Sequence, residues 1–393
     1  MTIPQPSREF RFVAACCRAA FDAGTIHQIE PAIVRVAELD WPLVLRLARF
    51  HRVQGLMSKG LGKTKASLPA DVGAALAGDS QAIAAHNLKA MLGCRVLAKE
   101  LQLADLPFLH VKGLTLAQLA YGESLSKVGA DIDILVPQDQ ILRCASILSG
   151  LGYDLTDPPP AIDFARLRSW HKTQKESQWR HSGSALQVDL HSRLADNPRL
   201  IPAIDTHSPQ QMVEVSCGTV LPTLADEQMF AYLAVHGSSS AWFRLKWITD
   251  FTAFIHAKGT DRLEEFYSHS LKLSAGRAGG QALLLADKVF GLLSDFPRLR
   301  TELARDWKNR WLADLAFTQL VHRREPAEPT KQIFGTARIH YSQLAIGRGA
   351  IFPLSELARQ LNAFLIRAKV RIRLRRPSNS NASLDNNDSV GRR

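Results

Sequence analysis

A short apolar segment that carries two aspartates constrains the fold of this chain more than any other feature. Positions 131–136 read Asp-Ile-Asp-Ile-Leu-Val and are followed by Pro137. The β-branched and aliphatic residues predict a strand, in which residues i and i+2 point to the same face. Asp131 and Asp133 therefore share one face, and the two isoleucines share the other. Because two carboxylates on an apolar strand reduce its burial energy, we expect a compensating ligand, and divalent metal ions bound to a nucleotide are the candidate.

A third carboxylate and a basic strand end lie in the same part of the chain. Positions 188–191 read Val-Asp-Leu-His, which places Asp189 and His191 on one face of a further predicted strand. Upstream, an apolar strand-like segment ends at Lys112 and Gly113. These three segments supply the residues whose chemistry is least explained by folding alone.

The hydrophobic pattern divides the chain into four parts. Residues 1–104 follow helical spacing, residues 105–222 alternate short strands with helices and a hairpin, and residues 223–375 are helical again. Residues 376–393 are rich in Ser, Asn and Asp, which predicts a disordered tail. The expected fold class is therefore α+β, with a small mixed-sheet core flanked by N-terminal and C-terminal helical regions.

Composition and cysteine usage limit the classes of protein that fit. No apolar run reaches the roughly 18 residues of a membrane-spanning helix, and the N-terminus has no apolar stretch typical of a signal peptide. The cysteines are scattered and odd in number, at positions 16, 17, 94, 144 and 217. We interpret them as reduced, mostly buried thiols and expect a cytoplasmic location.

The formal net charge of +12 suits an anionic ligand. Much of this charge is concentrated in residues 367–376, which hold six basic residues. Such a stretch is usually a solvated helix face. The apolar residues beside it, Leu361, Phe364 and Leu365, leave contact with an anionic membrane surface or a partner protein open. A nucleic-acid partner is the least favoured alternative, because charge alone suggests it.

These segments, in this order, resemble the nucleotidyltransferase superfamily with a DNA polymerase beta-like core. The finer resemblance is to the uncharacterised bacterial nucleotidyltransferase family, whose pattern is Lys-Gly, a later Tyr, Asp-Ile-Asp-Leu-Leu-Val and an acidic-x-His strand. The matching positions here are Lys112-Gly113, Tyr121, residues 131–136 and residues 188–191. With further similar segments on both sides, the resemblance covers most of residues 30–260.

The resemblance implies a metal-dependent mechanism. Asp131 and Asp133 would bind two Mg²⁺ ions, or Mn²⁺, that bridge the phosphates of an NTP. Asp189 would complete the second metal site and help to activate an acceptor hydroxyl. The three aspartates would thus be both the metal ligands and the catalytic residues. The acceptor of the nucleoside monophosphate is not implied and could be a small molecule, a saccharide, or a peptide or protein.

The resemblance also suggests which residues hold phosphate. Gly113 precedes a predicted helix N-terminus, where backbone N–H groups can bind phosphate, and Lys112 would add a point charge. Lys127 stands where the superfamily has an arginine, and Arg244 and Lys246 on a downstream helix are further candidates. The usual Gly-Ser of the superfamily is Lys-Gly-Leu here, so the phosphate contacts depart from its pattern.

Structural interpretations compete with these functional ones. The two aspartates of the Asp-x-Asp strand could cap a neighbouring helix, and the core could be a non-catalytic module that senses nucleotide or binds a partner. Retention of all three aspartates argues against both. His191 is expected to orient an aspartate rather than bind metal, His236 to be a buried structural histidine, and Asp250 to pair with a basic neighbour.

Overall fold

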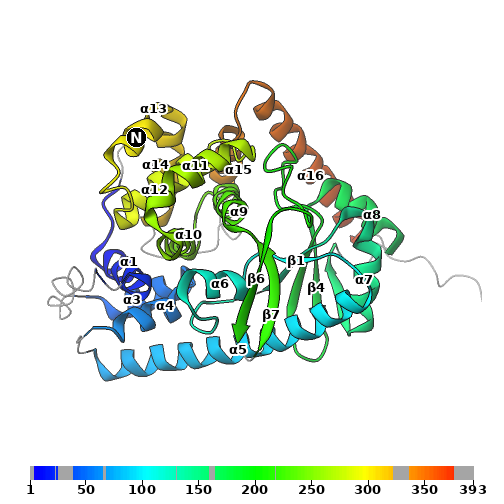
Figure 1. Ribbon diagram of the computed structural model, residues 1–393, viewed down its shortest axis with the longest axis horizontal. Helices are drawn as coiled ribbons and strands as arrows, with labels where there is room; N and C mark the ends of the chain where they lie inside the picture. Colours follow the sequence, from blue (N-terminus) through cyan, green and yellow to red (C-terminus); the bar gives the residue numbers. More distant parts are fainter. Residues whose placement is uncertain are drawn as a thin grey trace, which may run out of the picture.

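The computed structural model describes residues 4–22, 24, 39–64, 68–129, 131–158, 164–216, 218–321 and 336–375. Within them the fold is α+β as predicted, with helices before and after a small mixed sheet (Figure 1). The expected tail, residues 376–393, lies outside the described residues, and the domain boundaries at 104 and 222 stay predictions. No helix of the described part is both long and apolar enough to cross a membrane.

The N-terminal part is helical. Its described helices are α1 (Arg8–Phe21), α3 (Trp41–Phe50), α4 (Gln54–Leu61) and α5 (Ala70–Leu103). Asp40 is the N-cap of α3, a position at which short polar residues are preferred. Its Oδ1 accepts a hydrogen bond of 2.9 Å from the N–H of Leu43. The long helix α5 runs beneath the sheet (Figure 1). Its buried residues Cys94 and Leu97 belong to the same apolar core as Ile132.

A five-stranded mixed sheet follows α5 and lies to one side of the helical regions (Figure 1). Its strands are β1 (Leu109–His110), β2 (Asp131–Leu135), β3 (Tyr153–Asp157), β4 (Glu176–His181) and β5 (Gln187–His191), in the order β1-β2-β5-β4-β3. Strands β2 and β5 are parallel neighbours, and the other pairs are antiparallel. The connecting helices are α6 (Leu114–Tyr121), α7 (Ile141–Gly150) and α8 (Phe164–Thr173). The predicted hairpin around Ser182 is confirmed by β4 and β5.

A second hairpin was not predicted from the sequence. Strands β6 (Gln210–Ser216) and β7 (Thr219–Leu224) pair with each other, and Thr223 Oγ1 donates a hydrogen bond to the carbonyl of His110 in β1. The prediction that the chain turns helical after Pro222 was wrong by a few residues, because Pro222 lies within β7. The alternation of buried Val213 and Val215 with exposed Glu214 is the signal that could have revealed this hairpin.

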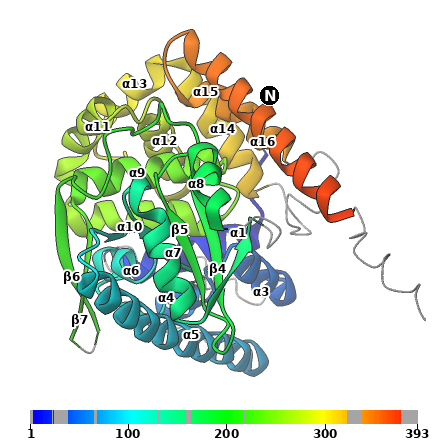
Figure 2. The ribbon, with the colours of Figure 1, turned by 90° about the vertical axis from the view of Figure 1, so that its right-hand side faces the viewer.

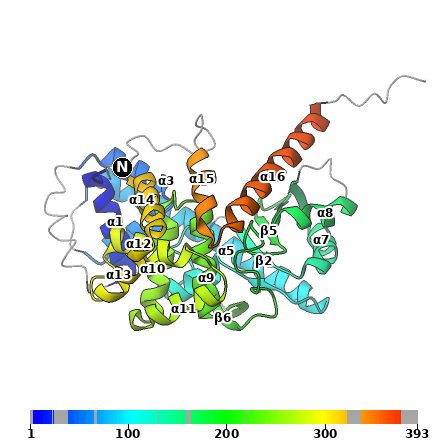
Figure 3. The same ribbon diagram turned by 90° about the horizontal axis from the view of Figure 1, so that it is seen from above.

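Eight helices of the described residues follow. They are α9 (Asp226–Ser239), α10 (Leu245–Lys258), α11 (Leu263–Lys272), α12 (Ala278–Phe290), α13 (Pro297–Arg305), α14 (Trp307–Val321), α15 (Ala337–Ile346) and α16 (Ile351–Arg375). Phe12 of α1, Met57 of α4 and Phe230 of α9 share one apolar core, so the two helical regions pack together. In contrast, the end of α16 projects from the molecule (Figures 2 and 3).

Candidate functional site

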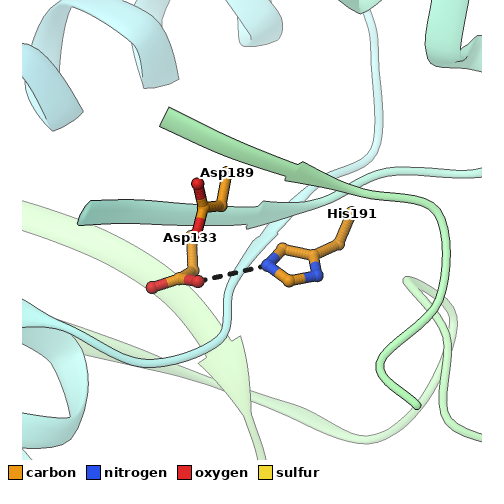
Figure 4. Close-up of side chains that lie close together, drawn as sticks. All are labelled: Asp133, Asp189 and His191. Carbon is orange, nitrogen blue, oxygen red and sulfur yellow. Dashed lines mark hydrogen bonds and ion pairs between the residues drawn. The ribbon is translucent and has the colours of Figure 1, made fainter. Parts of the chain in front are cut away.

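The predicted carboxylates of β2 and β5 lie side by side. The parallel register places Asp133 opposite Asp189, and Leu135 opposite His191. One ligand atom from each of Asp133, Asp189 and His191 lies within 4.8 Å of the others, and all three side chains are buried (Figure 4). Two carboxylates and an imidazole at this spacing have the donor atoms to hold a divalent cation.

Asp131 starts β2, two residues before Asp133 and opposite Gln187. It is half-buried and stands outside the group of three donors, but it lines the same two cavities as Asp133. Burial raises the pKa of Asp131, and the nearby Asp133 adds to this effect. Its carboxylate has no hydrogen bond or ion pair with the described residues, so its oxygens are available to a ligand.

Asp133 is held by two positively polarised groups. Lys112 Nζ lies 2.6 Å and His191 Nε2 lies 3.1 Å from the same Asp133 Oδ1 atom. Burial alone would raise the pKa of Asp133, but Lys112 and the His191 hydrogen bond outweigh burial and lower it. Asp133 is therefore ionised at neutral pH. Lys112, a candidate for binding phosphate, thus contacts Asp133, a candidate metal ligand.

A further carboxylate, Glu176, lies beside His191, and the sequence did not reveal it. Glu176 opens β4 opposite His191, and its Oε2 lies 3.3 Å from His191 Nδ1, without the alignment of a hydrogen bond. Lys175 Nζ lies 2.9 Å from the same Oε2 atom. Lys-Glu pairs are common in surface loops, so no sequence signal marks this one. His191 thus lies between two carboxylates and orients Asp133, as predicted for a structural partner.

Asp189 is the least stabilised of the three aspartates. Its Oδ1 accepts a hydrogen bond of 2.9 Å from Gln187 Nε2, and no cationic side chain of the described residues pairs with it. Burial raises the pKa of Asp189 to about 7, and the neighbouring carboxylates Asp133, Glu176 and Asp131 reinforce the rise. A cation bound here would reduce the repulsion between Asp189 and the carboxylates around it.

Basic residues gather in a pocket on the aspartate side of β2, which we call the aspartate pocket. Its polar lining residues are Lys112, Lys127, Asp131, Asp133, His236, Lys246 and Asp250. Lys127 Nζ lies 3.3 Å from Asp250 Oδ2, and Tyr121 donates a hydrogen bond of 2.9 Å to Asp250 Oδ1. Asp250 therefore pairs with a basic neighbour as expected.

Lys246, on the first turn of α10, is the lysine of the aspartate pocket whose charged form is disfavoured. Burial lowers the pKa of Lys246 to about 7, and repulsion from Lys127, Lys112 and Arg52 reinforces the shift. His236 packs at the edge of Trp247 and is half-buried rather than fully buried. Cations crowded in this way favour a bound anion.

Gly113 forms the turn between β1 and α6. Its φ of +70° is a conformation that other residues rarely adopt, and α6 has no side-chain cap at this end. Gly113 lines the aspartate pocket together with Lys112. The first turn of α6 therefore begins beside the aspartates, where its N–H groups can approach an anion.

Arg244 does not line the aspartate pocket with Lys112, Lys127 and Lys246, the other basic candidates for binding phosphate. Arg244 precedes α10 instead of lying on it, is buried, and donates a hydrogen bond to the carbonyl of Phe50. Its guanidinium lies over the rings of Phe50 and Phe243, at 5.3 and 5.2 Å from their centroids. This placement ties α10 to α3 and gives no support to a phosphate contact.

Asn87 on α5 is a positioning residue that the sequence did not reveal. Its buried side-chain amide donates hydrogen bonds to the carbonyls of Ser124 (3.1 Å), Leu125 (3.0 Å) and Lys127 (2.8 Å). Gly129 passes so close that a Cβ there would lie 2.7 Å from Asn87 Oδ1. One amide thus fixes the loop that carries Lys127 and leads into Asp131.

Replacing Asn87 by Ala is expected to loosen this loop. Loss of these contacts, in which the two N–H groups of one amide are shared among three carbonyls, should lower the free energy of unfolding by about 2 to 4 kcal/mol. Because the loop leads into the candidate metal ligand Asp131, we expect Mn²⁺ affinity to fall by about 10- to 100-fold. Urea unfolding and Mn²⁺ titration measure the two effects.

Asn309→Ala is the matched control for this prediction. Asn309 is equally buried, and its amide donates to the carbonyl of Leu303 at 3.0 Å in the C-terminal helical region. This variant should lose stability and keep its Mn²⁺ affinity. Equal Mn²⁺ affinity of the two variants would show that Asn87 has no role in positioning the site.

Comparison with known families agrees with this geometry. A sequence model of the family described as "Uncharacterised nucleotidyltransferase" matches residues 37–291, well over half of the chain. The match runs from shortly before α3 to the end of α12 and includes all of the site residues described above. A search of curated proteins finds no match.

Proposed function

Since the chain belongs to the family of uncharacterised nucleotidyltransferases, we propose that it is an enzyme that transfers a nucleoside monophosphate from an NTP to an acceptor. The observation that carries this proposal is the pairing of Asp133 with Asp189 on parallel strands, beside a pocket lined by lysines. Carboxylates bind the metal of a metal–nucleotide complex, and lysines bind its phosphates.

The donor set fits Mg²⁺, with Mn²⁺ as an alternative. Asp131, Asp133 and Asp189 offer carboxylate oxygens, which these ions prefer. Asp131 is unpartnered among the described residues, and burial, reinforced by the neighbouring carboxylates, raises the pKa of Asp189 to about 7. When bound, two such ions would stabilise the charge on the attacking and leaving oxygens of the transfer.

Side chains of the protein would bind the phosphates and activate the acceptor. Asp133 would hold a divalent ion, and the ammonium of Lys112, which contacts this carboxylate in the free protein, would then contact the phosphates. Lys127 and Lys246 line the same pocket and would hold the far phosphates. Asp189 would orient the acceptor hydroxyl and take its proton.

The acceptor can be sought directly. Purified protein is incubated with Mg²⁺, isotope-labelled NTPs and an acceptor panel of saccharides, peptides and cell extract, and nucleotidylated products are identified by mass spectrometry. We expect metal-dependent transfer that disappears in a folded Asp131→Asn variant. Metal-dependent NTP binding without transfer to any acceptor would favour the nucleotide-sensing alternative, and NTP binding that survives Asp131→Asn plus Asp133→Asn would refute the site.

Nucleotide affinity should depend on pH through Lys246. In the free protein its pKa is about 7, and a bound triphosphate would favour the protonated form. At saturating Mg²⁺, the affinity for NTP is therefore expected to fall as pH rises from 7 to 9, by up to tenfold per pH unit. Isothermal titration calorimetry measures this dependence.

Lys246→Arg is the control, because a guanidinium stays charged throughout this range. This variant should bind NTP with little dependence on pH between 7 and 9. The same pH dependence in the variant and the parent protein would exclude Lys246 as its source.

A further inference from the structure

Helix α16 attaches to the molecule through an unusual face. Phe352 and Glu356 are buried, at 4% and 2% exposure. Glu356 Oε2 accepts a hydrogen bond of 2.8 Å from Asn197 and pairs with Arg359, while Gln360 donates to the carbonyl of His340 at 3.0 Å. Apart from Phe352 and the partly buried Ile366, which packs against the apolar core under the sheet, the contacts that hold this helix are made by polar side chains.

The large apolar side chains of α16 face solvent. Their exposed fractions are 64% for Ile351, 69% for Leu354, 56% for Leu357, 58% for Leu361, 68% for Phe364 and 47% for Leu365. Their spacing of three and four residues aligns them along one side of the helix, and we call this set the α16 stripe. A helix that packs on a protein core normally buries its apolar face, so the orientation of α16 is reversed.

The stripe continues toward a strongly basic end of the same helix. The backbone of α16 extends to Arg375, and positions 366–376 contain six basic and no acidic residues. The end of the helix projects from the molecule, where another surface can reach it (Figures 2 and 3). Helix α16 lies outside residues 37–291, the range that the family model matches.

We propose that α16 binds an anionic lipid surface, with the α16 stripe inserted at the level of the head groups and the basic end beside their charges. Interfacial helices combine a Leu- and Phe-rich face with Lys and Arg, as this one does. Parallel pairing with a second copy through the stripe would bring two basic ends together, and like charges oppose that contact. An anionic lipid surface can contact both the apolar α16 stripe and the basic end of the helix.

Vesicle sedimentation of the full chain tests this proposal. The probes are vesicles of phosphatidylcholine alone and vesicles with 30% phosphatidylglycerol, each at low and high salt. Binding is expected to be at least tenfold stronger to the anionic vesicles and to weaken in high salt. Substituting Leu361→Asp and Phe364→Asp together should reduce this binding at least tenfold.

Leu88→Asp with Leu92→Asp is the matched control, because these residues form an exposed apolar pair on α5, at 42% and 59% exposure. The control should bind vesicles as the parent does, and circular dichroism checks that both double variants fold. Absence of binding to anionic vesicles, or equal binding by the α16 variant, would overturn the proposal. A dimer that light scattering detects and the α16 variant abolishes, without vesicle binding, would instead identify a second copy as the occupant.

Discussion

An Asp133→Asn variant is expected to lose metal-dependent nucleotide transfer by about 10³-fold or more, since it removes a carboxylate that we propose as a metal ligand. The same substitution should destabilise the fold. Lys112 and His191 both contact Asp133 Oδ1, and a neutral amide leaves the buried ammonium without its counter-charge. Loss of one partner of a buried ion pair typically costs about 3 to 5 kcal/mol. Because Lys112 retains 22% exposure, we expect the lower end of that range.

Urea unfolding and label transfer from NTP measure these two effects. Asp139→Asn is the matched control, because Asp139 is an exposed aspartate in the turn after β2. It should change neither stability nor transfer. Transfer by Asp133→Asn at the parental rate would exclude Asp133 as a metal ligand, whatever the change in stability.

An Asp189→Asn variant is expected to be inactive yet more stable than the parent protein in metal-free buffer at pH 8. The folded pKa of Asp189 is about 7, above the ordinary value of 3.8, so the folded chain binds more protons than the unfolded chain between these values. Stability from this group is therefore lost as pH rises from about 4 to 7. The full penalty is up to about 4 kcal/mol at about 1.4 kcal/mol per pKa unit.

An asparagine at position 189 keeps the acceptor for the Gln187 hydrogen bond and removes the ionisation. The stability difference between variant and parent should be small near pH 4 and grow toward pH 8 in the presence of EDTA. Mg²⁺ should stabilise the parent protein and leave the variant unchanged. A variant that is less stable than the parent at pH 8 would show that Asp189 is well accommodated as a carboxylate.

Period-two alternation made much of the site predictable. It placed Asp131 with Asp133, and Asp189 with His191, on shared strand faces before any pairing was known. The structure confirms that these faces meet, because β2 and β5 are parallel neighbours in register. The sequence held no information on this register, since strand pairing depends on packing over the whole core.

Contacts between distant elements could not be predicted. Asn87 acts from α5 on a loop about 40 residues later, and Glu176 reaches His191 across a hairpin. Neither residue belongs to a local pattern. Such contacts follow from tertiary packing rather than from local sequence.

Arg244 was placed on a helix for a reason that the structure explains. The expected helix begins after Arg244, because Ala241 and Trp242 have φ values of 47° and 53° and α10 starts only at Leu245. The Trp242 ring fills the space beside Gly237, where a Cβ would lie 2.4 Å from it. Arg244 is consequently directed toward Phe50 and away from the aspartate pocket.

Binding of Mn²⁺ in the presence of NTP, followed by electron paramagnetic resonance, tests most directly whether these aspartates form a metal–nucleotide site. The parent chain should bind two Mn²⁺ ions for each bound NTP, which is more than NTP binds without protein. A variant with Asp133→Asn and Asp189→Asn should take up none. Equal uptake of Mn²⁺ by the parent chain and this variant would contradict the assignment of the site.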